Sequence, residues 1–446
     1  MSAAKAVAQP LYPLDDLPEQ ETGWSMLHRL REMERWDGAS LQALQRLHLQ
    51  HLLVHHAQHT PQFQQRLAVA GLAPSDLTTV QALRRLPPLE RADVQRAGPG
   101  LFSTLVPFDH LPVHTASTSG STGQPVVVRR TQLNTWLNEA ATLRDHAWWQ
   151  RPRNGGRITM IRPQFDQVRQ VSAHEGSQDN VAQQIPITTD VHEQIRLIAA
   201  FEPQVLLVYP NNLAALLEVW QNGGGVPPSL LHLKTIGETV SPALRALAWA
   251  VLQRPIEDSY SSEEMGMMAL QCPVSGMYHT LAETHHIEVV HEDGSACAPG
   301  ETGRLLVTDL HNLATPLVRY AIGDWAEVGG PCACGRHLPT LQRILGRERN
   351  LVRLPDGRRH WPLIGFQRFE QVMPVRQYQV VQHSLQEVEL RVRLDSAITP
   401  LQREALSQIV REALGHDFVV RVQTFDAPLP AGANGKFEEF VCKVQQ

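Results

Sequence analysis

The stretch TSGSTGQP occupies residues 118–125, and seven of its eight residues are small, hydroxylated, glycine or proline, with Gln124 as the exception. Glycine permits backbone angles at which several N–H groups point at one anion, and the hydroxyl groups add further donors. The stretch does not contain the G-K-[ST] of a Walker A loop. A solvated Ser/Gly turn is the competing interpretation, and the strand and helix patterns on either side count against it. We therefore predict a phosphate-binding loop.

The segments that follow the loop predict an α/β core. Three valines stand at 126–128, and residues 131–149 have a helical pattern. Short apolar runs at 158–161 and 205–208 are typical of buried strands, and helical patterns lie between the later strands. Strands that alternate with helices indicate an α/β fold.

The regions on the two sides of this core differ in the secondary structure that their sequences predict. Upstream, residues 26–70 have apolar residues at helical spacing, Thr60-Pro61 marks a stop or a new cap, and Gly71 marks a helix end. Downstream, residues 280–345 predict a β-rich subdomain of short strands and glycine turns.

The last part of the chain predicts a small α+β domain. It contains strand patterns at 388–394 and 418–422 with one helix between them. We expect a large N-terminal domain at 1–345 and a small C-terminal domain at 346–446. This boundary is argued from the order of motifs, because no linker of distinct composition separates the two parts.

Composition and charge narrow the class of protein. With 446 residues, 42% hydrophobic residues and 19% charged residues, the chain is long enough for several domains of a globular protein. A net charge of −5 gives no general attraction to nucleic acid or to anionic lipid. No apolar run reaches the roughly 18 residues of a membrane span, and the N-terminal residues lack a secretory signal, so we expect a cytoplasmic protein. Most of the 21 histidines are expected to be solvated.

Further motifs follow the loop in a fixed order. They read GE at 237–238, YSSEEMG at 260–266, YAIGD at 320–324, GRERN at 346–350 and NGKF at 434–437. With the loop, this order resembles the adenylate-forming superfamily, whose members activate carboxylic acids with ATP. The resemblance implies that the loop closes over the ATP phosphates through Thr118, Ser119, Gly120, Ser121, Thr122 and Gly123.

The resemblance also implies a role for residues of the middle motifs. Gly237 and Glu238 would help to form the pocket for adenine and the acyl group, and Tyr260 would stack on adenine. Glu264 would bind the Mg²⁺ that bridges the phosphates, a task that suits a hard oxygen ligand.

The later motifs complete the implied site. Asp324 would accept hydrogen bonds from both ribose hydroxyls, and Arg347 would contact ribose or phosphate. Arg349 would lie at the pivot of a mobile C-terminal domain. Lys436 would reach the carboxylate and the α-phosphate and stabilise charge as the acyl oxygen attacks phosphorus.

Three residues depart from the pattern of the superfamily. Gln124 stands where lysine or arginine is common, and Arg129 or Arg130 are candidates to replace that charge. Ser261 replaces glycine and Glu263 replaces threonine; a second carboxylate should repel phosphate unless it points away or binds metal. These departures motivate a competing hypothesis, a catalytically degenerate nucleotide-binding protein.

Three segments resemble one branch, the phenylacetate-CoA ligases with capsular-polysaccharide adenylating proteins and coenzyme F390 synthetases. They are TPQFQQRLAVAGL at 60–72, TPLVRY at 315–320 and CACGR at 332–336. The branch implies an aryl acid as substrate and coenzyme A as the thiol acceptor. Adenylyl transfer to a hydroxyl and amide formation with an amine remain alternatives, and the oligomeric state stays open, a homodimer included.

The cysteines predict a metal site. Cys272, His279, Cys332 and Cys334 form C-x₆-H and C-x-C pairs, and three thiolates with one imidazole make a closed tetrahedral zinc set. Four protein ligands leave no open position, so this zinc would be structural. Two buried cysteines beside an unrelated C-x-C are the alternative. Weaker ligand candidates are His285 and His286, whereas Cys297 and Cys442 are expected to be free.

Overall fold

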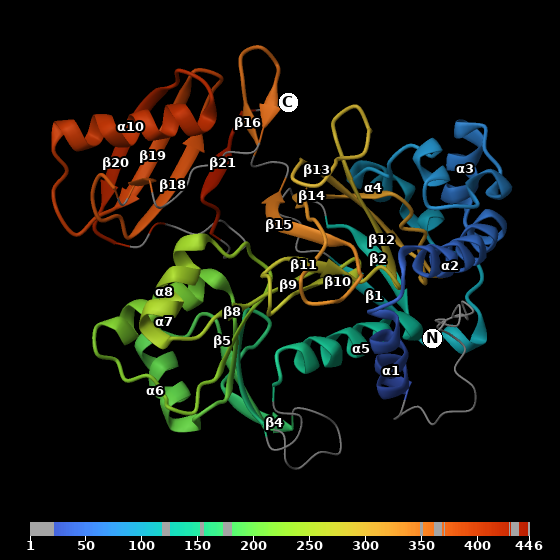
Figure 1. The fold of residues 1–446 in the computed structure, drawn as a ribbon, viewed down its shortest axis with the longest axis horizontal. Coiled ribbons are helices and arrows are strands. Elements are labelled where there is room, and N and C mark those ends of the chain that lie inside the picture. The colour runs from blue at the N-terminus through green and yellow to red at the C-terminus, as the bar shows by residue number, and fades with distance from the viewer. Residues whose placement is uncertain are drawn as a thin grey trace. The chain divides into compact units, whose positions relative to one another are not determined.

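The computed structural model describes residues 22–117, 125–151, 156–172, 181–347, 351–360, 368–369, 371–427, 429 and 437–444, without the side chains of Thr22, Arg347, Arg359 and His360 (Figure 1). The predicted phosphate loop and Lys436 lie outside the described residues. The chain forms two compact units. One holds residues 1–208, 227–237 and 256–344, and the other holds 209–226, 238–255 and 345–446. The domain division at 345/346 stays a prediction.

The first unit contains the expected α/β sheet. Its strand order is β4-β5-β3-β6-β7-β8. The strands are β3 (Arg157–Arg162), β4 (Arg169–Ser172), β5 (Val181–Pro186), β6 (Val205–Val208), β7 (His232–Thr235) and β8 (Ile256–Glu257). Neighbours from β5 to β8 run parallel, and β4 pairs antiparallel at the edge. Helix α6 (Val191–Phe201) connects β5 to β6, as parallel pairing requires a crossover.

A second sheet carries the YSSEEMG and YAIGD motifs. Its order is β12-β13-β14-β15-β11-β10-β9. The strands are β9 (Ser259–Ser262), β10 (Gly266–Gln271), β11 (Tyr278–Thr280), β12 (His285–Val290), β13 (Thr302–Asp309), β14 (Tyr320–Val328) and β15 (Thr340–Arg347). This confirms the β-rich region that the sequence predicts, and the region begins somewhat earlier, at β9.

The described chain on either side of the predicted phosphate loop forms a hairpin. Strand β1 (Val113–Ser117) pairs antiparallel with β2 (Val127–Thr131), and helix α5 (Gln132–Trp148) follows. The Thr131 hydroxyl accepts a hydrogen bond from Asn134 N, which caps the helix. The strand and helix predicted after the loop are therefore confirmed.

Helices precede the hairpin. They are α1 (Thr22–Met33), α2 (Gly38–His59), α3 (Pro61–Ala70) and α4 (Arg91–Ala97), with short 3₁₀ turns at Pro74–Leu77, Ala82–Arg85, Gly98–Leu101 and Phe108–His110. Thr60 closes α2 and starts α3, because Pro61 fits a first helical turn, where no N–H donor is needed. Gly71 ends α3 with a φ of 62°.

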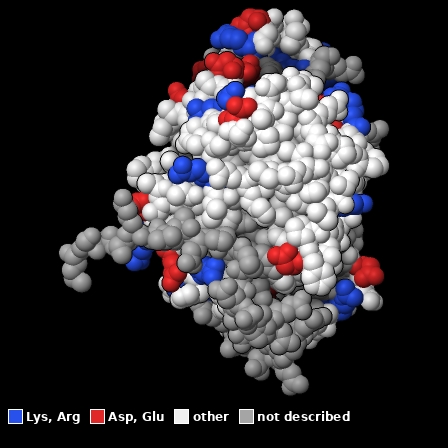
Figure 2. Space-filling view, turned by 90° about the vertical axis from the view of Figure 1, so that its right-hand side faces the viewer, with Lys and Arg blue, Asp and Glu red and all other residues white. Residues whose placement is uncertain are grey.

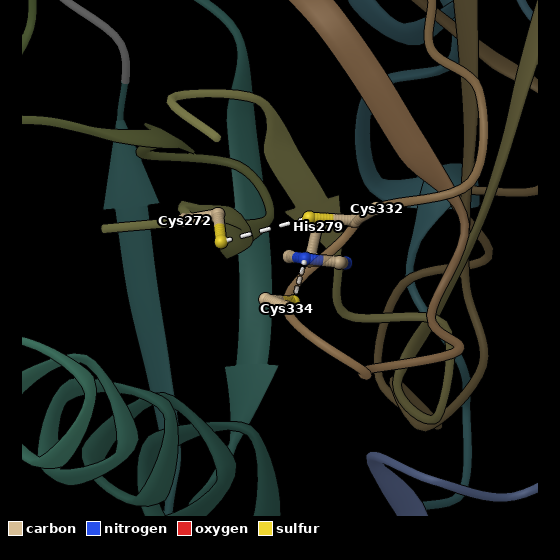
Figure 3. Close-up of side chains that lie close together, drawn as sticks. All are labelled: Cys272, His279, Cys332 and Cys334. Atoms are coloured by element: carbon tan, nitrogen blue, oxygen red, sulfur yellow. Dashed lines mark hydrogen bonds between the residues drawn. The ribbon is translucent and has the colours of Figure 1, made fainter. Parts of the chain in front are cut away.

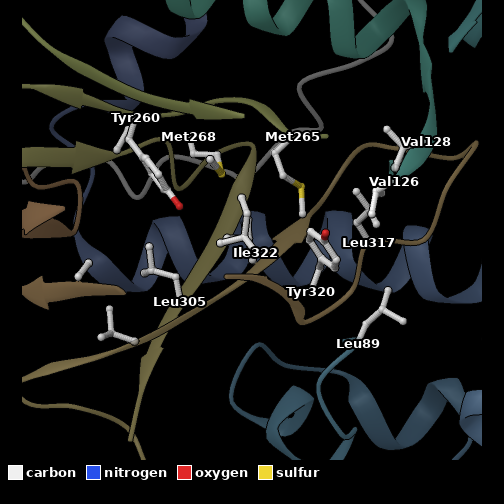
Figure 4. Close-up of a cluster of buried hydrophobic side chains, with 14 of the residues drawn as sticks. Leu89, Val126, Val128, Tyr260, Met265, Met268, Leu305, Leu317, Tyr320 and Ile322 are labelled. Carbon is white, nitrogen blue, oxygen red and sulfur yellow. The ribbon is translucent and has the colours of Figure 1, made fainter. Parts of the chain in front are cut away.

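One hydrophobic cluster joins the motif-bearing segments of the first unit (Figure 4). Val126 and Val128 follow the loop, Tyr260 and Met265 come from the YSSEEMG motif, and Tyr320 begins the YAIGD motif. All five side chains are buried in this cluster. Burial of such side chains contributes about 1.5–3 kcal/mol each. The same packing that stabilises the fold therefore brings the YSSEEMG and YAIGD motifs together with the chain that follows the predicted loop.

The second unit contains an α+β domain. Its strands are β16 (Val352–Arg353), β17 (Arg359–His360), β18 (Gln377–Gln382), β19 (Glu387–Arg393), β20 (Val419–Phe425) and β21 (Phe440–Cys442), and its helices include α7 (Pro210–Gln221), α8 (Pro242–Leu252) and α10 (Pro400–Leu414). Strands β20-β19-β18-β21 form a sheet. Apolar residues of α10 and of this sheet share one buried cluster. The strands and the helix predicted for the C-terminal part are confirmed.

On the face drawn in Figure 2, the described acidic and basic side chains are scattered among uncharged ones rather than gathered by sign. Among the described helices, none combines the length and the apolar character that crossing a bilayer requires.

The expectation of solvated histidines is wrong for a buried set. Apart from the metal candidates, these residues are His48, His55, His56, His110 and His311. His56 illustrates the reason, because its Nδ1 lies 2.8 Å from Thr60 Oγ1 and its Nε2 lies 2.8 Å from Asn312 O. A neutral imidazole offers one donor and one acceptor, so both nitrogens are satisfied. Burial lowers the pKa of His56 to about 3, which keeps the ring neutral.

Candidate active site and metal centre

Two predicted nucleotide-binding residues lie in direct contact. Tyr260 on β9 donates its phenolic hydrogen to Asp324 Oδ2 on β14, at 2.7 Å, and both side chains are buried. A carboxylate has about four lone-pair sites, and this bond uses one of those of Asp324. The fold therefore places an aromatic ring and a carboxylate side by side.

Glu264 lies in the turn between β9 and β10 and is only 3% exposed. The Ser262 hydroxyl accepts a hydrogen bond from Met265 N and holds this turn. Arg91 on α4 approaches the carboxylate, with Nη1 3.7 Å from Glu264 Oε1. Because a buried carboxylate is stable only beside a positive charge, the position of Glu264 is suited to bind a cation.

The sequence analysis did not foresee Arg91. It stands five residues after Leu86 in a proline-rich segment, and nothing in its local pattern marks it as a partner of a residue 173 positions later (264 − 91). Only the packing of α4 against β14 in one cluster, through Val94 and Tyr320, brings it to the YSSEEMG turn.

The other predicted nucleotide residues are placed only in part. Gly237 has a φ of 75°, which favours glycine, and belongs to the first unit. Glu238 belongs to the second unit, where its Oε2 accepts a hydrogen bond from Asn211 N at 3.0 Å. Arg347 ends β15, and its side chain lies outside the described part. The roles of all these residues stay predictions, as do those of the loop residues 118–123 and of Lys436.

The four predicted metal ligands come together (Figure 3). One ligand atom each from Cys272, His279, Cys332 and Cys334 lies within 4.8 Å of every other. Cys332 Sγ is 3.7 Å from Cys272 Sγ, and Cys334 Sγ is 3.2 Å from His279 Nε2. Sulfur atoms and an imidazole nitrogen that converge in this way fit the donor set of tetrahedral zinc.

Neighbouring groups orient these side chains as metal ligands require. His279 Nδ1 lies 3.2 Å from Leu338 O, a bond that places the hydrogen on Nδ1 and leaves Nε2 as the ligand atom. Burial would raise the pKa of the Cys272 thiol, but hydrogen bonds from the backbone of Ser275 and Val274 hold this pKa below its ordinary value. The lower pKa makes it easier for Cys272 to lose the proton that a thiolate ligand must give up.

Polar contacts connect the metal-site loop to the helices. Arg336 Nε donates to Glu34 Oε2 at 3.0 Å, and its guanidinium lies 4.0 Å from the centre of the Trp148 ring. Trp148 at the end of α5 donates to Glu34 Oε1 at 2.9 Å and packs edge-on against His279. The loop that carries two of the cysteines is therefore fixed to α5 and to the end of α1.

The weaker ligand candidates lie elsewhere. His285 Nε2 is 3.2 Å from Met265 O, and its Nδ1 is 2.9 Å from Thr284 Oγ1, so this ring supports the YSSEEMG turn instead. Cys297 is a free cysteine, as expected, and its sulfur lies near His291 and Glu301 on a more exposed hairpin. Burial raises the pKa of Cys297 to about 11, with Glu301 and Asp293 adding to the effect.

The fold, the order of motifs and the Tyr260–Asp324 pair define an adenylate-forming enzyme. No protein-family model matches the sequence. The chain is 30% identical over 324 residues to the phenylacetate-coenzyme A ligase of Escherichia coli. These aligned residues make up 70% of this chain and 72% of that ligase. The chain therefore belongs to the phenylacetate-CoA ligase family and is an acid–thiol ligase. The Thermus thermophilus phenylacetate-coenzyme A ligase is 27% identical and aligns over 86% of this chain and 88% of its own.

Solved structures agree on the fold. A 2-hydroxyisobutyryl-CoA ligase in its postadenylation state matches with a TM-score of 0.75, over 97% of this chain and 95% of that one, at 19% identity. An anthranilate CoA ligase in complex with anthranoyl-AMP matches with a TM-score of 0.53 at 16% identity, over 72% of this chain and 64% of that one. The predicted adenylate-forming α/β fold is confirmed.

Proposed function

We propose that this protein activates an aryl carboxylic acid with ATP and Mg²⁺ and transfers the acyl group to coenzyme A. The names of the phenylacetate-coenzyme A ligases that it resembles support the aryl acid and the acceptor. The observation that carries the nucleotide part is the buried Tyr260–Asp324 hydrogen bond, together with the burial of Glu264. A reaction that consumes ATP and coenzyme A also favours the cytoplasm.

The two half-reactions balance as follows. The carboxylate oxygen attacks the α-phosphorus of ATP, the acyl–adenylate bond forms, and pyrophosphate leaves. The sulfur of coenzyme A then attacks the acyl carbon and the thioester forms. AMP leaves, and the thiol proton of coenzyme A is released. Adenylation is needed because AMP is a far better leaving group than the oxygen of a free carboxylate.

Each described residue has a separate task in this proposal. The Tyr260 ring stacks on adenine, and the remaining lone pairs of Asp324 accept hydrogen bonds from the ribose hydroxyls. Glu264 would hold Mg²⁺, which when bound would neutralise charge on the phosphates. Because Arg91 lies 3.7 Å from the same carboxylate, it balances the Glu264 charge when the metal is absent.

Residues outside the described part complete the proposal. The loop at 118–123 closes over the phosphates, Arg347 contacts ribose or phosphate, and Lys436 stabilises charge on the reacting carboxylate and α-phosphate. The domain at 346–446 rotates between the two half-reactions, so that one cleft serves both steps. Gly237 and Glu238 contribute to the adenine and acyl pocket.

We assign the Cys272, His279, Cys332 and Cys334 cluster to a structural zinc ion. Four protein ligands leave no position for substrate, so this ion would brace the fold and take no part in either chemical step. The strand that leads to Cys272 is β10, which pairs with β9 and its Tyr260. Zinc would therefore support the register of the nucleotide motif.

The test is acid-dependent exchange of pyrophosphate into ATP across a panel of aryl and fatty acids, followed by a thioester assay with coenzyme A. We expect exchange with an aryl acid, thioester formation, and loss of both in Lys436→Ala. Exchange without thioester, but with an amine or hydroxyl product, would favour the amide-ligase or adenylyl-transferase alternative. Tight ATP binding without exchange for any acid would favour the degenerate nucleotide-binding protein.

A further inference from the structure

Two arginines follow the predicted phosphate loop, and the structure distinguishes them. The Arg129 backbone is fixed, since its N–H donates to Thr315 Oγ1 and its carbonyl accepts from the Asn312 side chain. Its exposed side chain stacks on Phe102, with the guanidinium carbon 4.3 Å from the ring centre. This arginine is therefore already used on the surface of the hairpin.

Arg130 points to the other face of β2, as alternation along a strand requires. Its guanidinium packs against Gly266, the last residue of the YSSEEMG motif, where a Cβ atom would lie only 2.5 Å from Arg130 Nη2. Asn138 Oδ1 lies on the same spot and accepts a hydrogen bond from Met267 N at 2.9 Å. Glycine at 266 is thus required by the approach of Arg130 as well as by its φ of 75°.

Within the described part of the chain, few of the donors of Arg130 have a partner. Its Nη2 makes one long bond, 3.5 Å, to Asn134 O, and among the described residues its Nε has no hydrogen-bond partner. A guanidinium has five N–H donors, so a half-buried one with so few partners is suited to receive an anion. Burial lowers the pKa of Arg130, and the negative charges of Asp309 and Glu263 act in the opposite direction. Arginine stays charged at neutral pH.

Its position relates two departures from the pattern of the superfamily. Gln124 lacks the cation that is common after the loop, and Glu263 adds a carboxylate where threonine is common. Arg130 lies beside Gly266, and Gly266 follows Glu264 by two residues and Glu263 by three. In the sequence, Arg130 follows Gln124 by six positions. Arg130 would therefore approach the phosphates from the side of Glu264 and would not occupy the place of the Gln124 side chain.

We propose that Arg130 supplies the phosphate-binding cation that Gln124 lacks, with Glu263 as its counter-ion when ATP is absent. This inference rests on the proposed use of ATP and names a binding residue for its phosphates. The extra carboxylate at 263 is then tolerated because it acts electrostatically, together with Asp309, on the cation that offsets it. Arg129 takes no part.

The first test measures the affinity for ATP with Mg²⁺ by calorimetry in the absence of acid. Arg130→Met should weaken ATP binding by about tenfold to a hundredfold, the range for a charge-assisted contact, while AMP binding changes little. Arg130→Lys should recover part of the loss. The matched control is Arg129→Met, which should stay within about twofold of the parent chain. Equal losses for ATP and AMP would overturn the proposal.

The second test separates phosphate binding from a structural pairing with Glu263. In Arg130→Met/Glu263→Thr no carboxylate at 263 is left without its cation. Asp309 still loses the nearby charge in both variants, so the thermal midpoint of each is compared with that of the parent. We expect the double variant still to bind ATP weakly, and addition of Gln124→Lys should restore the affinity. Recovery of ATP affinity in the double variant without Gln124→Lys, or no recovery with it, would overturn the proposal.

These outcomes are independent of the acid. If no carboxylic acid supports pyrophosphate exchange, the proposed function fails, yet the calorimetric comparison of ATP and AMP still decides whether Arg130 binds phosphate. Where exchange is found, the KM for ATP should rise in Arg130→Met while the KM for the acid stays within about twofold of its parent value.

Discussion

Tyr260 and Asp324 are 64 residues apart in the sequence, and the Tyr260 hydroxyl donates to the Asp324 carboxylate across 2.7 Å. The bond fixes both groups of the proposed adenosine site before nucleotide arrives. Tyr260→Phe keeps the ring but frees the carboxylate to rotate. We expect the KM for ATP to rise by about threefold to tenfold, since one hydrogen bond of this kind is worth about 1 kcal/mol.

The same sheet offers a matched control for this prediction. Tyr278 also donates to a buried aspartate, with its hydroxyl 2.5 Å from Asp258 Oδ2, and its strand β11 carries none of the proposed nucleotide residues. Tyr278→Phe should lower the thermal midpoint by a similar amount and leave the KM for ATP within about twofold. Equal effects of both variants on that KM would contradict a nucleotide role for Tyr260.

Metal content tests the proposed zinc centre. The purified protein should contain about one zinc per chain, and Cys272→Ser should abolish it, because three remaining ligands cannot close the tetrahedral site. Loss of zinc should lower the thermal midpoint and weaken ATP binding, since β10 connects Cys272 to the strand of Tyr260. Chelation of the parent chain should have the same effects.

Cys297→Ser provides the matched variant for the zinc measurement. Cys297 groups with His291 and Glu301, but two of these three residues are only half-buried and the third is exposed. We expect zinc content and ATP affinity to stay at the parent values in this variant. A parent chain with well under one equivalent of zinc would contradict the assignment. Loss of zinc in Cys297→Ser would instead assign the ion to the group of His291, Cys297 and Glu301.

The sequence predicted those parts of the site that short patterns specify. Cys272, His279, Cys332 and Cys334 are recognisable because their spacing and chemistry are specific, and Thr131 marks the start of α5 because a hydroxyl caps it. The contact of Arg91 with Glu264 depends on the packing of separate segments, which no local pattern records.

The buried histidines show the same limit. On sequence alone His56 belongs to a helix with several polar residues, where solvation is the simplest expectation. Its burial depends on Asn312 O, which lies 256 positions away and accepts its hydrogen. Residues whose partners lie far away in the sequence are therefore those for which composition and periodicity give the least information.

A buried ion pair gives a prediction for stability. Arg144 is fully buried, and its Nη2 donates to Glu283 Oε1 at 2.9 Å while Glu34 lies 3.5 Å from its Nε. Glu283→Gln would remove the negative charge that pairs with this guanidinium. We expect the free energy of unfolding to fall by about 3–5 kcal/mol. The exposed pair of Arg196 and Glu193 on α6 is the comparison, and Glu193→Gln should not change the urea midpoint measurably. Similar midpoints for both variants would contradict the argument.

The buried histidines predict how stability depends on pH. Burial holds the pKa of His56 at about 3, against an ordinary value of 6.5. Because the folded-state pKa is the lower one, the unfolded chain binds more protons between these two values. The contribution of His56 to stability is therefore fully present above pH 6.5 and is lost as pH falls from 6.5 towards 3. Each pH unit in this window costs about 1.4 kcal/mol, or about 2.7 kcal/mol at pH 4.5.

Urea unfolding at pH 7.5 and pH 4.5 measures this loss. His56→Gln should be less stable than the parent at pH 7.5, because Thr60 and Asn312 lose a well-placed partner. It should lose about 2–3 kcal/mol less than the parent on acidification, since glutamine does not titrate. His28→Gln on the exposed face of α1 serves as the control and should follow the parent at both pH values. If His56→Gln and the parent lose the same free energy between the two pH values, the imidazole of His56 is not held neutral in the folded protein.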